Sequence, residues 1–251
     1  ERQNFVYGNE EEGVKGCIAN GIDEKTANQI YDDMTDFAKY AFNKSHAAAY
    51  AVVAYQTAFL KYYYPKEFMA ALMTSVMDNT TKVSEYILAC RNMGIPILPP
   101  DINEGYSGFS VSGNGIRYGL SAIKSVGRAV VDVIIAERES GGLFKNLDDF
   151  VSRMSNKEVN KRTLESFIKS GALDTLPGTR KQKLIVSGDL LESKSKENKT
   201  VMEGQMSFFD IAPEEEKDNF HITFPDVGEY DKQTLLAFEK ETIGIYVSGH
   251  P

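Results

Sequence analysis

The sequence predicts a mainly α-helical fold in which a small β-hairpin separates two groups of helices. Three observations lead to this prediction. Apolar residues recur at helical spacing, Gly and Pro residues lie between these stretches, and residues 108–118 form two short extended segments around a Gly-Asn-Gly turn. The 251 residues, of which 42% are hydrophobic, suffice for one large domain or two to three small ones.

Four helices are predicted in the first part of the chain. Asp23 is a suitable N-cap for the first helix, and Pro65 suits the first turn of the third. The second helix is apolar on nearly every side, so we expect it to be buried. The four stretches run from Asp23 to about Ala41, from Ala47 to Tyr64, from Lys66 to Met77 and from about Thr81 to Met93.

The run from Ile95 to Pro100 contains three prolines and predicts extended backbone that leaves the helical region. We place a domain boundary there, after residue 98. Residues 108–118 then predict a β-hairpin that leads into the next group of helices.

The stretch from residue 118 to residue 142 predicts two helices joined by a very short turn, Ser125-Val126-Gly127. Gly127 can take a positive φ, and the backbone N–H groups that follow it have no partner within the second helix, which Arg128 opens. Such a turn at the positive end of a helix dipole binds an anion, and a nucleic-acid phosphate is the natural candidate. This is the pattern of a helix-hairpin-helix, although Ser125 replaces the first glycine of the usual motif. An ordinary corner between two helices is the alternative.

A second unit of this kind is predicted from Lys161 to Asp174, where apolar residues at helical spacing are followed by Gly171 as a helix C-cap. Two such units suggest a tandem arrangement that grips the backbone of a duplex without reading its bases. The predicted nucleic-acid contacts are Lys124, Ser125, Val126, Gly127, Arg128, Lys161, Arg162, Lys169, Ser170 and Gly171.

The distribution of charge agrees with this prediction, although the formal net charge of the chain is −8. Residues 117–187 hold thirteen Lys and Arg against eight Asp and Glu, whereas residues 1–36 hold three against nine and residues 188–232 hold five against twelve. Phosphate binding depends on local charge more than on the total. A solvated basic face without a ligand is the alternative.

The last part of the chain predicts a linker, a short apolar motif and a final helix. Residues 188–203 are rich in Ser, Lys, Glu and Asn and predict a flexible linker. The motif that follows places two adjacent aromatic residues in a polar surrounding, so we expect it to dock on this chain or on a partner. It consists of Gln205, Met206, Ser207, Phe208 and Phe209, and a helix is predicted from Tyr230 to Thr242.

Several classes of protein are excluded by what the sequence lacks. The chain has no long apolar run for a membrane span and no signal-peptide pattern, so we expect no membrane association and a cytoplasmic location. Its only cysteines are Cys17 and Cys90, and its three histidines form no cluster, so no metal site is predicted. Ser45 and His46 have no carboxylate nearby to complete a catalytic set.

Five motifs in fixed order resemble the C family of bacterial replicative DNA polymerases. The resemblance covers essentially the whole chain and is highly specific. The motifs are Phe42–Ala51 (FNKSHAAAYA), Tyr62–Ala71 (YYYPKEFMAA), Ile97–Asn103 (ILPPDIN), Ser170–Asp174 (SGALD) and Glu241–Pro251 (ETIGIYVSGHP).

This resemblance implies four regions. Residues 1–98 would be the C-terminal part of the polymerase fingers, and residues 99–187 the tandem helix-hairpin-helix domain that grips duplex DNA. Residues 188–228 would be a linker with a motif that binds the sliding clamp, and residues 229–251 a helix and the lead-in to an OB domain. In the fingers, the residues on the template and nucleotide side would be Asn43, Lys44, Ser45 and His46.

The resemblance also implies where the chemistry lies. In this family the catalytic aspartates that hold two Mg²⁺ ions belong to the palm, upstream of this chain, so no catalytic residue is assigned. The chain begins with Glu1 rather than Met, and we expect it to be a piece of a longer nucleotidyltransferase that is inactive on its own. The implied partners are primer–template DNA, the sliding clamp and other subunits of the replicase.

Two other functions remain open at this stage. One is a non-catalytic helix-hairpin-helix module that binds DNA outside replication, which would have no need of the motif at Gln205–Phe209. The other is a protein-interaction scaffold, which the net acidity would suit. Salt-dependent binding of duplex DNA separates the scaffold from the other two.

Overall fold

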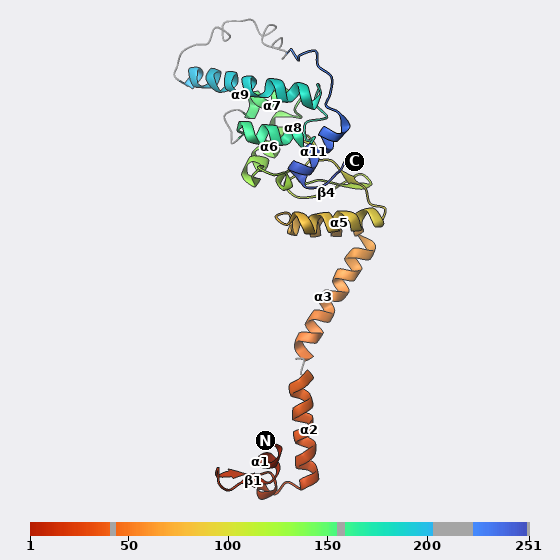
Figure 1. The fold of residues 1–251 in the computed structure, drawn as a ribbon, viewed down its shortest axis with the longest axis vertical. Coiled ribbons are helices and arrows are strands. Elements are labelled where there is room, and N and C mark those ends of the chain that lie inside the picture. Colours follow the sequence, from red (N-terminus) through yellow and green to blue (C-terminus); the bar gives the residue numbers. More distant parts are fainter. Residues whose placement is uncertain (41–43, 155–158, 203–222, 250–251) are drawn as a thin grey trace. The chain divides into compact units, whose positions relative to one another are not determined.

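The computed structural model describes residues 1–40, 44–154, 159–202 and 223–249 (Figure 1). These residues are mostly helical, and the strands are short, so the predicted mainly α fold is confirmed. The chain divides into two compact units, Glu1–Phe59 and Leu60–Pro251. This division falls inside a helix, at a different place from the boundary that the sequence motifs suggest after residue 98.

The first unit is built on a short helix, a two-stranded hairpin and a long helix. Helix α1 (Arg2–Val6) is followed by strands β1 (Gly8–Asn9) and β2 (Val14–Lys15), which pair antiparallel, and by the 3-10 turn η1 (Ile18–Asn20). Helix α2 (Glu24–Tyr40) begins as predicted, because the carboxylate of Asp23 accepts hydrogen bonds from the backbone N–H of Thr26 at 3.0 Å and from its hydroxyl at 2.6 Å.

Helix α3 (Lys44–Tyr63) forms near the predicted place but is not buried. All twenty of its residues are exposed, including Tyr50 and Tyr55 with 62% and 70% of their surface accessible. The prediction of a buried helix is therefore wrong for the described chain. The apolar composition of α3 indicates that its side chains would gain from burial, but it does not indicate which surface would bury them.

The second unit opens with two helices and a small sheet. Helix α4 (Pro65–Ser75) begins with proline, and helix α5 (Thr80–Asn92) is capped by Asn79, whose side chain accepts from the backbone N–H of Lys82 at 3.1 Å. Strands β4 (Ser110–Ser112) and β5 (Gly115–Arg117) form the predicted hairpin. Strand β3 (Ile97–Leu98) adds to β5 in parallel, with Ile97 opposite Ile116.

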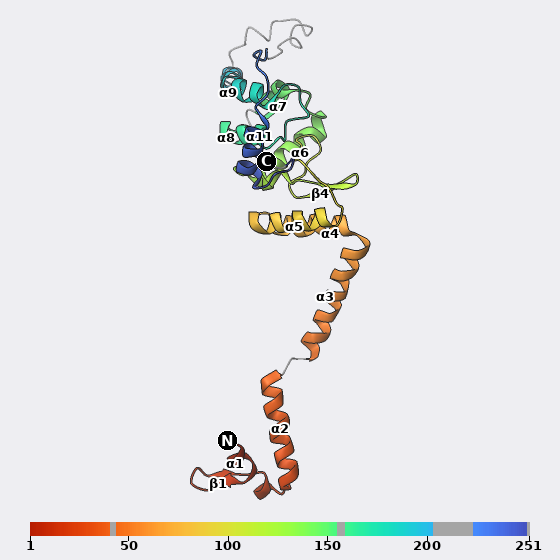
Figure 2. The ribbon, with the colours of Figure 1, turned by 45° about the vertical axis from the view of Figure 1, so that its right-hand side comes forward.

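The rest of the second unit is helical, and helices α7, α8 and α9 lie together in both views (Figures 1 and 2). Its elements are η2 (Leu120–Ala122), α6 (Arg128–Gly141), α7 (Leu147–Met154), α8 (Lys161–Lys169), α9 (Arg180–Met202) and α11 (Lys232–Ile243). Among the described residues, no helix has both the length and the apolar character needed to cross a membrane.

Two elements differ from their predictions. The first helix of the predicted hairpin is the single 3-10 turn η2, because Leu120 and Ile123 are three residues apart and one such turn already buries both. Helix α9 continues to Met202, so the predicted flexible linker is wrong for residues 188–202. That segment contains no proline and is rich in good helix formers, and Leu190 and Leu191 pack against the core. A helix begun by its buried first turns therefore continues through it.

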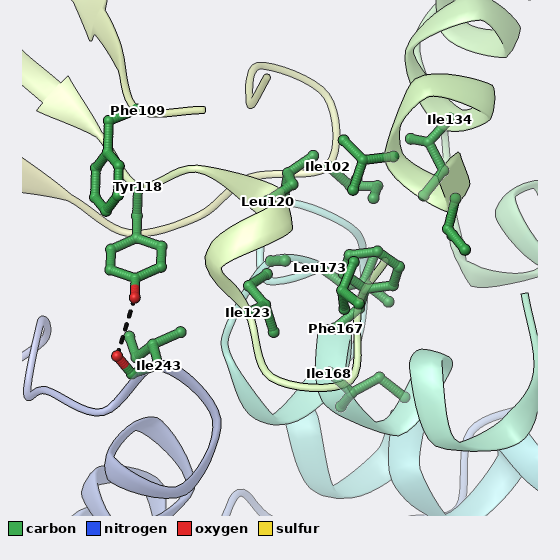
Figure 3. Close-up of a cluster of buried hydrophobic side chains, with 14 of the residues drawn as sticks. Ile102, Phe109, Tyr118, Leu120, Ile123, Ile134, Phe167, Ile168, Leu173 and Ile243 are labelled. Carbon is green, nitrogen blue, oxygen red and sulfur yellow. Dashed lines mark hydrogen bonds between the residues drawn. The ribbon is translucent and has the colours of Figure 1, made fainter. Parts of the chain in front are cut away.

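One hydrophobic core holds the second unit together, and it places helix α8 next to the segment that precedes α6 (Figure 3). Leu120, Ile123, Phe167 and Ile168 are almost fully buried in it. Tyr118 is 1% exposed, and its hydroxyl donates to the backbone carbonyl of Ile243 at 3.0 Å. The core therefore fixes the ends of α6, α8 and α11 relative to one another.

Candidate nucleic-acid interface

The turn before α6 has the shape of a hairpin corner, but its strained residue is not the glycine that was predicted. Ser125 has φ 68°, in the left-handed region, whereas Gly127 has φ −80° and ψ 151° and is extended. The predicted positive φ at Gly127 is therefore wrong. Val126 is buried between them, and its N–H closes the turn on the carbonyl of Ile123 at 3.1 Å. Because Val126 must point inward, the reversal of the chain falls on Ser125.

The start of α6 offers backbone N–H groups to a ligand. Within the described part of the chain, the N–H groups of Gly127, Arg128 and Ala129 form no hydrogen bond, and no side chain caps the helix. All three residues are exposed. Unpaired amides at the positive end of a fourteen-residue helix make a favourable position for an anion.

Helix α8 brings further cations to this corner. The hydroxyl of Thr163, in its first turn, lies 3.4 Å from the carbonyl oxygen of Ser125 and donates to it. Lys161 and Arg162 precede Thr163 and are exposed, as is Lys124. We define the cradle as residues Lys124–Arg128 together with Lys161 and Arg162. The structure thus brings together seven of the ten predicted contacts, of which Val126 is buried and can contribute only by its backbone.

Helix α8 is positioned by signals that the sequence prediction missed. The side chain of Asn160 accepts from the N–H of Thr163 at 3.0 Å and caps the helix. An asparagine just before a helical stretch is a recognisable cap signal. By contrast, the hydrogen bond from the N–H of Lys124 to the carbonyl of Thr242 at 2.8 Å joins distant segments, and no local pattern indicates it.

The N–H groups of the second predicted corner are already hydrogen-bonded within the protein. Gly171 has φ 84° at the end of α8, as its assignment to the helix C-terminus predicted, but it is buried, and its N–H donates to the carbonyl of Ile168 at 3.1 Å. Ser170 is 1% exposed, and its N–H donates to Ser166. The prediction that Ser170 and Gly171 contact phosphate is therefore wrong. A helix C-terminus presents carbonyl groups, which repel anions.

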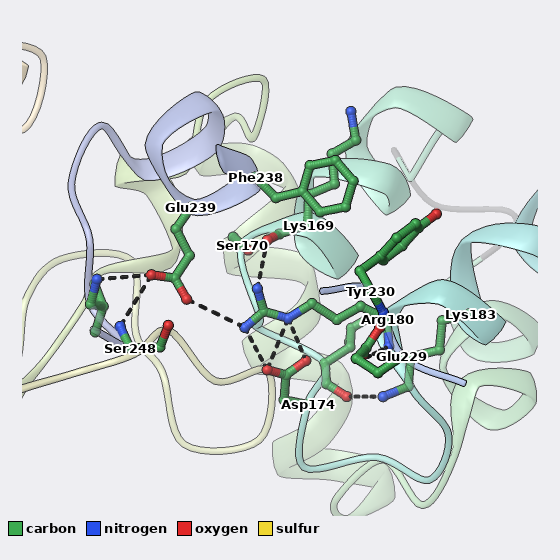
Figure 4. Close-up of polar contacts among 12 residues, drawn as sticks. Lys169, Ser170, Asp174, Arg180, Lys183, Glu229, Tyr230, Phe238, Glu239 and Ser248 are labelled. Carbon is green, nitrogen blue, oxygen red and sulfur yellow. Dashed lines mark hydrogen bonds and ion pairs between the residues drawn. The ribbon is translucent and has the colours of Figure 1, made fainter. Parts of the chain in front are cut away.

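Arg180 occupies the place where a second phosphate was expected (Figure 4). Its guanidinium pairs with the carboxylate of Asp174, with Nη2 and Oδ2 2.6 Å apart, and donates to the carbonyl of Lys169 at 3.1 Å. It also lies 3.7 Å from Glu239, whose side chain is 2% exposed. Burial lowers the pKa of Arg180, but the hydrogen bond and charge of Asp174 outweigh it and hold that pKa above its ordinary value.

The network around Arg180 ties the last described segment to helix α9. The carboxylate of Glu229 accepts from the backbone N–H groups of Arg180 at 2.8 Å and Lys181 at 3.1 Å, and so caps α9. Glu239 accepts from the N–H groups of Val247 and Ser248 at 2.9 and 3.1 Å. These contacts engage Arg180 within the protein, so its charge holds α8, α9 and α11 together and is not available to a ligand.

Lys169 is also engaged by this segment. Its ammonium nitrogen lies 3.4 Å from the carboxylate of Glu241. It also lies 5.3 Å from the centre of the Phe238 ring, and Figure 4 shows these two side chains. Its side chain is 25% exposed. Lys169 therefore has a carboxylate partner in the free protein, whereas Lys161 and Arg162 have none among the residues that the structure describes.

The predicted residues of the fingers lie in the first unit. Lys44, Ser45 and His46 are exposed in the first turn of α3, and the ring of His46 lies 4.3 Å from that of Tyr50, centre to centre. Asn43 lies outside the described residues, as does the whole predicted clamp motif, Gln205–Phe209. Among the described residues, no group of three or more His, Cys, Asp and Glu side chains is placed to hold a metal ion.

Comparison with known proteins identifies both the motif and the wider relationship. Residues 94–183 match the family model of the helix-hairpin-helix motif. The chain is 44% identical over 241 residues to the DNA polymerase III subunit alpha of Vibrio cholerae, covering 94% of this chain and 20% of that protein. It is 44% identical to the same subunit of Thermus aquaticus and 43% identical to that of Escherichia coli K12, in each case over 95% of this chain. The chain thus spans about a fifth of the length of these relatives. The resemblance indicated by its motifs is confirmed: over nearly its whole length, this chain is related to one segment of the DNA polymerase III alpha subunits.

Proposed function

We propose that the chain is the part of a DNA polymerase III alpha subunit that holds the backbone of duplex DNA. The observation that carries this proposal is the set of unpaired N–H groups at Gly127, Arg128 and Ala129. They lie at a helix N-terminus beside four exposed cations: Lys124, Arg128, Lys161 and Arg162. Backbone amides and cations bind phosphate but carry no base information, so the binding is independent of sequence.

The cradle lies at a single corner of the protein, the turn before α6. One corner grips one stretch of backbone, while the Gly171 end of α8 supports it from inside the protein. A role in DNA replication fits the relatives named above better than a role as an isolated DNA-binding module does, since those relatives match 94% to 95% of the chain.

The polymerase chemistry belongs, in this proposal, to the remainder of a longer protein. Template-directed nucleotidyl transfer would use carboxylates that hold Mg²⁺. The described residues contain no group of three or more His, Cys, Asp and Glu side chains placed to hold a metal ion. The 251-residue chain alone should therefore bind primed duplex without extending the primer. We place the whole protein in the cytoplasm, together with other replicase subunits.

We propose the segment Gln205–Phe209 as a contact for the sliding clamp. Two adjacent aromatic side chains and a methionine would fill an apolar pocket, and the glutamine amide would bond at its rim. A peptide spanning Glu203–Asp210 should bind the clamp, and replacing Phe208 and Phe209 by alanine should weaken binding at least about tenfold. Equal binding by both peptides would refute this contact.

A salt titration tests the cradle. The affinity of the chain for a fluorescent duplex should fall steeply between about 50 and about 200 mM salt. The double variant Lys161→Ala/Arg162→Ala should bind more weakly and reduce the slope of log K against log salt by about two. Lys15→Ala/Lys25→Ala removes two exposed cations from the first unit and should change neither quantity. A salt-independent affinity would exclude backbone binding.

A further inference from the structure

Helix α11 places an acidic residue at the edge of the cradle. Its last turn is fixed there, because the carbonyl of Thr242 accepts from the N–H of Lys124 at 2.8 Å. The neighbouring residue, Glu241, holds the ammonium of Lys169 at 3.4 Å. We propose that Glu241 limits the affinity of the cradle: its carboxylate engages Lys169 in the free protein and is exchanged for a backbone phosphate when duplex binds. This inference rests on the proposed binding of duplex.

The contacts around Lys169 hold both its backbone and its side chain in place. Its carbonyl accepts from the guanidinium of Arg180 at 3.1 Å, which fixes the backbone at the end of α8. Its ammonium lies over the ring of Phe238, 5.3 Å from the centre, which restricts the directions that the side chain can take. Lys169 is therefore a positioned cation rather than a freely moving one.

The exposure of the two partners decides that this ion pair can exchange. The side chains of Lys169 and Glu241 are 25% and 55% exposed, so water and salt screen their attraction. The neighbouring pair of Arg180 and Glu239 is 8% and 2% exposed. Breaking that buried pair would leave a buried charge without a partner, so Arg180 cannot exchange Glu239 for a phosphate.

The carboxylate of Glu241 also acts on the cradle directly. An uncompensated negative charge near a bound phosphate weakens binding, and the released Glu241 stays close because Thr242 is bonded to Lys124. If the ion pair only docked α11, removing the charge of Glu241 would loosen that helix and would not strengthen binding. The two roles thus predict different results for affinity: a gain if Glu241 limits binding, and no gain if it only docks α11.

The test measures duplex affinity and thermal stability of the full 251-residue chain. Glu241→Gln should bind a fluorescent duplex about three- to tenfold more tightly at low salt, with a gain that shrinks as salt rises. Adding Lys169→Gln should reduce that gain, and Lys169→Gln should cost more in the Glu241→Gln background than in the wild type. Glu139→Gln, which removes an exposed carboxylate from the last turn of α6, is the matched control and should change affinity less than about twofold.

The outcomes separate this inference from the proposed function. If the wild-type chain binds duplex and Glu241→Gln binds no more tightly than Glu139→Gln, the role of Glu241 is refuted and the cradle stands. If the wild-type chain binds no duplex at any salt concentration, the proposed function fails and the inference fails with it. A lower melting temperature of Glu241→Gln with unchanged binding per folded molecule would assign the pair to docking alone.

Discussion

Ser125 is the residue on which the shape of the cradle depends. Among the described residues it is the one non-glycine with a positive φ, 68°. The left-handed conformation costs a residue with a Cβ roughly 1–2 kcal/mol. The turn keeps it because buried Val126 and the hydrogen bond from Thr163 fix the backbone on both sides.

Replacing Ser125 by glycine should therefore stabilise the protein. Glycine relieves the strain, and its extra freedom in the unfolded chain offsets about 0.4–1 kcal/mol of the gain. We expect a net increase in the free energy of unfolding of about 0.5–1 kcal/mol, measured by urea denaturation. Duplex affinity should not fall, because the proposed contacts at this position are made by the backbone. A destabilised variant would show that the serine side chain supports the turn.

Two glycines of the motif should respond differently to alanine. At Gly127 a Cβ would meet no atom within 4 Å and φ is negative, so Gly127→Ala should leave stability and duplex binding almost unchanged. At Gly171 φ is 84° and a Cβ would lie 2.3 Å from Nη2 of Arg180, which is held by Asp174. Gly171→Ala should cost about 2–3 kcal/mol, again by urea denaturation, from strain and a disturbed ion pair. Equal effects at both sites would contradict the two backbone conformations.

At the scale of elements, local patterns predicted most helices but not the caps and contacts that come from distant parts of the sequence. The starts of α2, α4 and α5 follow from Asp23, Pro65 and Asn79, which act on their own helices. The cap of α9 is Glu229, 49 residues away from Arg180 in sequence, and no local pattern indicates it. The prediction for the second corner failed for the same reason. Gly171 was recognisable as a helix end from its local pattern, but its burial depends on Arg180, which that pattern does not indicate.

The cap of α9 makes a prediction about pH. Burial raises the pKa of Glu229, but hydrogen bonds from the N–H groups of Tyr230, Arg180 and Lys181 and the charge of Arg180 lower it below its ordinary value. A carboxylate with a lower pKa in the folded state stabilises the fold above its unfolded value of about 4.5, and this contribution is lost as pH falls through the folded pKa.

Glu229→Gln should therefore be less stable than the wild type at pH 7, by about 1 kcal/mol for a weakened cap. The difference between the two unfolding free energies should narrow at acidic pH, measured by urea denaturation at pH 7 and below pH 4.5. Glu192→Gln, at an exposed position further along α9, should match the wild type at both pH values. A difference that stays constant with pH would mean that the charge of Glu229 is not involved.

At the scale of the whole molecule, the buried side chains belong to separate groups. The large core of the second unit gathers its buried residues between Met69 and Ile245. Val6 and Ala27 are buried in the first unit and are not part of that core. A compact unit with its own core is expected to fold without the rest of the chain.

A chain reduced to residues 64–251 should therefore keep the stability and the duplex affinity of the second unit. It begins at Tyr64, the N-cap of α4, and retains the cradle, the core and the docked α11. We expect its unfolding free energy to stay within about 1 kcal/mol of that of the second unit in the full chain, followed by circular dichroism in urea. Its duplex affinity should stay within about twofold of that of the full chain.

A chain of residues 1–202 is the matched deletion. It loses Glu229, Glu239 and the Thr242 carbonyl that holds Lys124, so it should be less stable and should bind duplex more weakly. If residues 64–251 unfolded at a clearly lower urea concentration than the second unit does in the full chain, the two units would depend on each other. The stability of the cradle would then require the first unit as well.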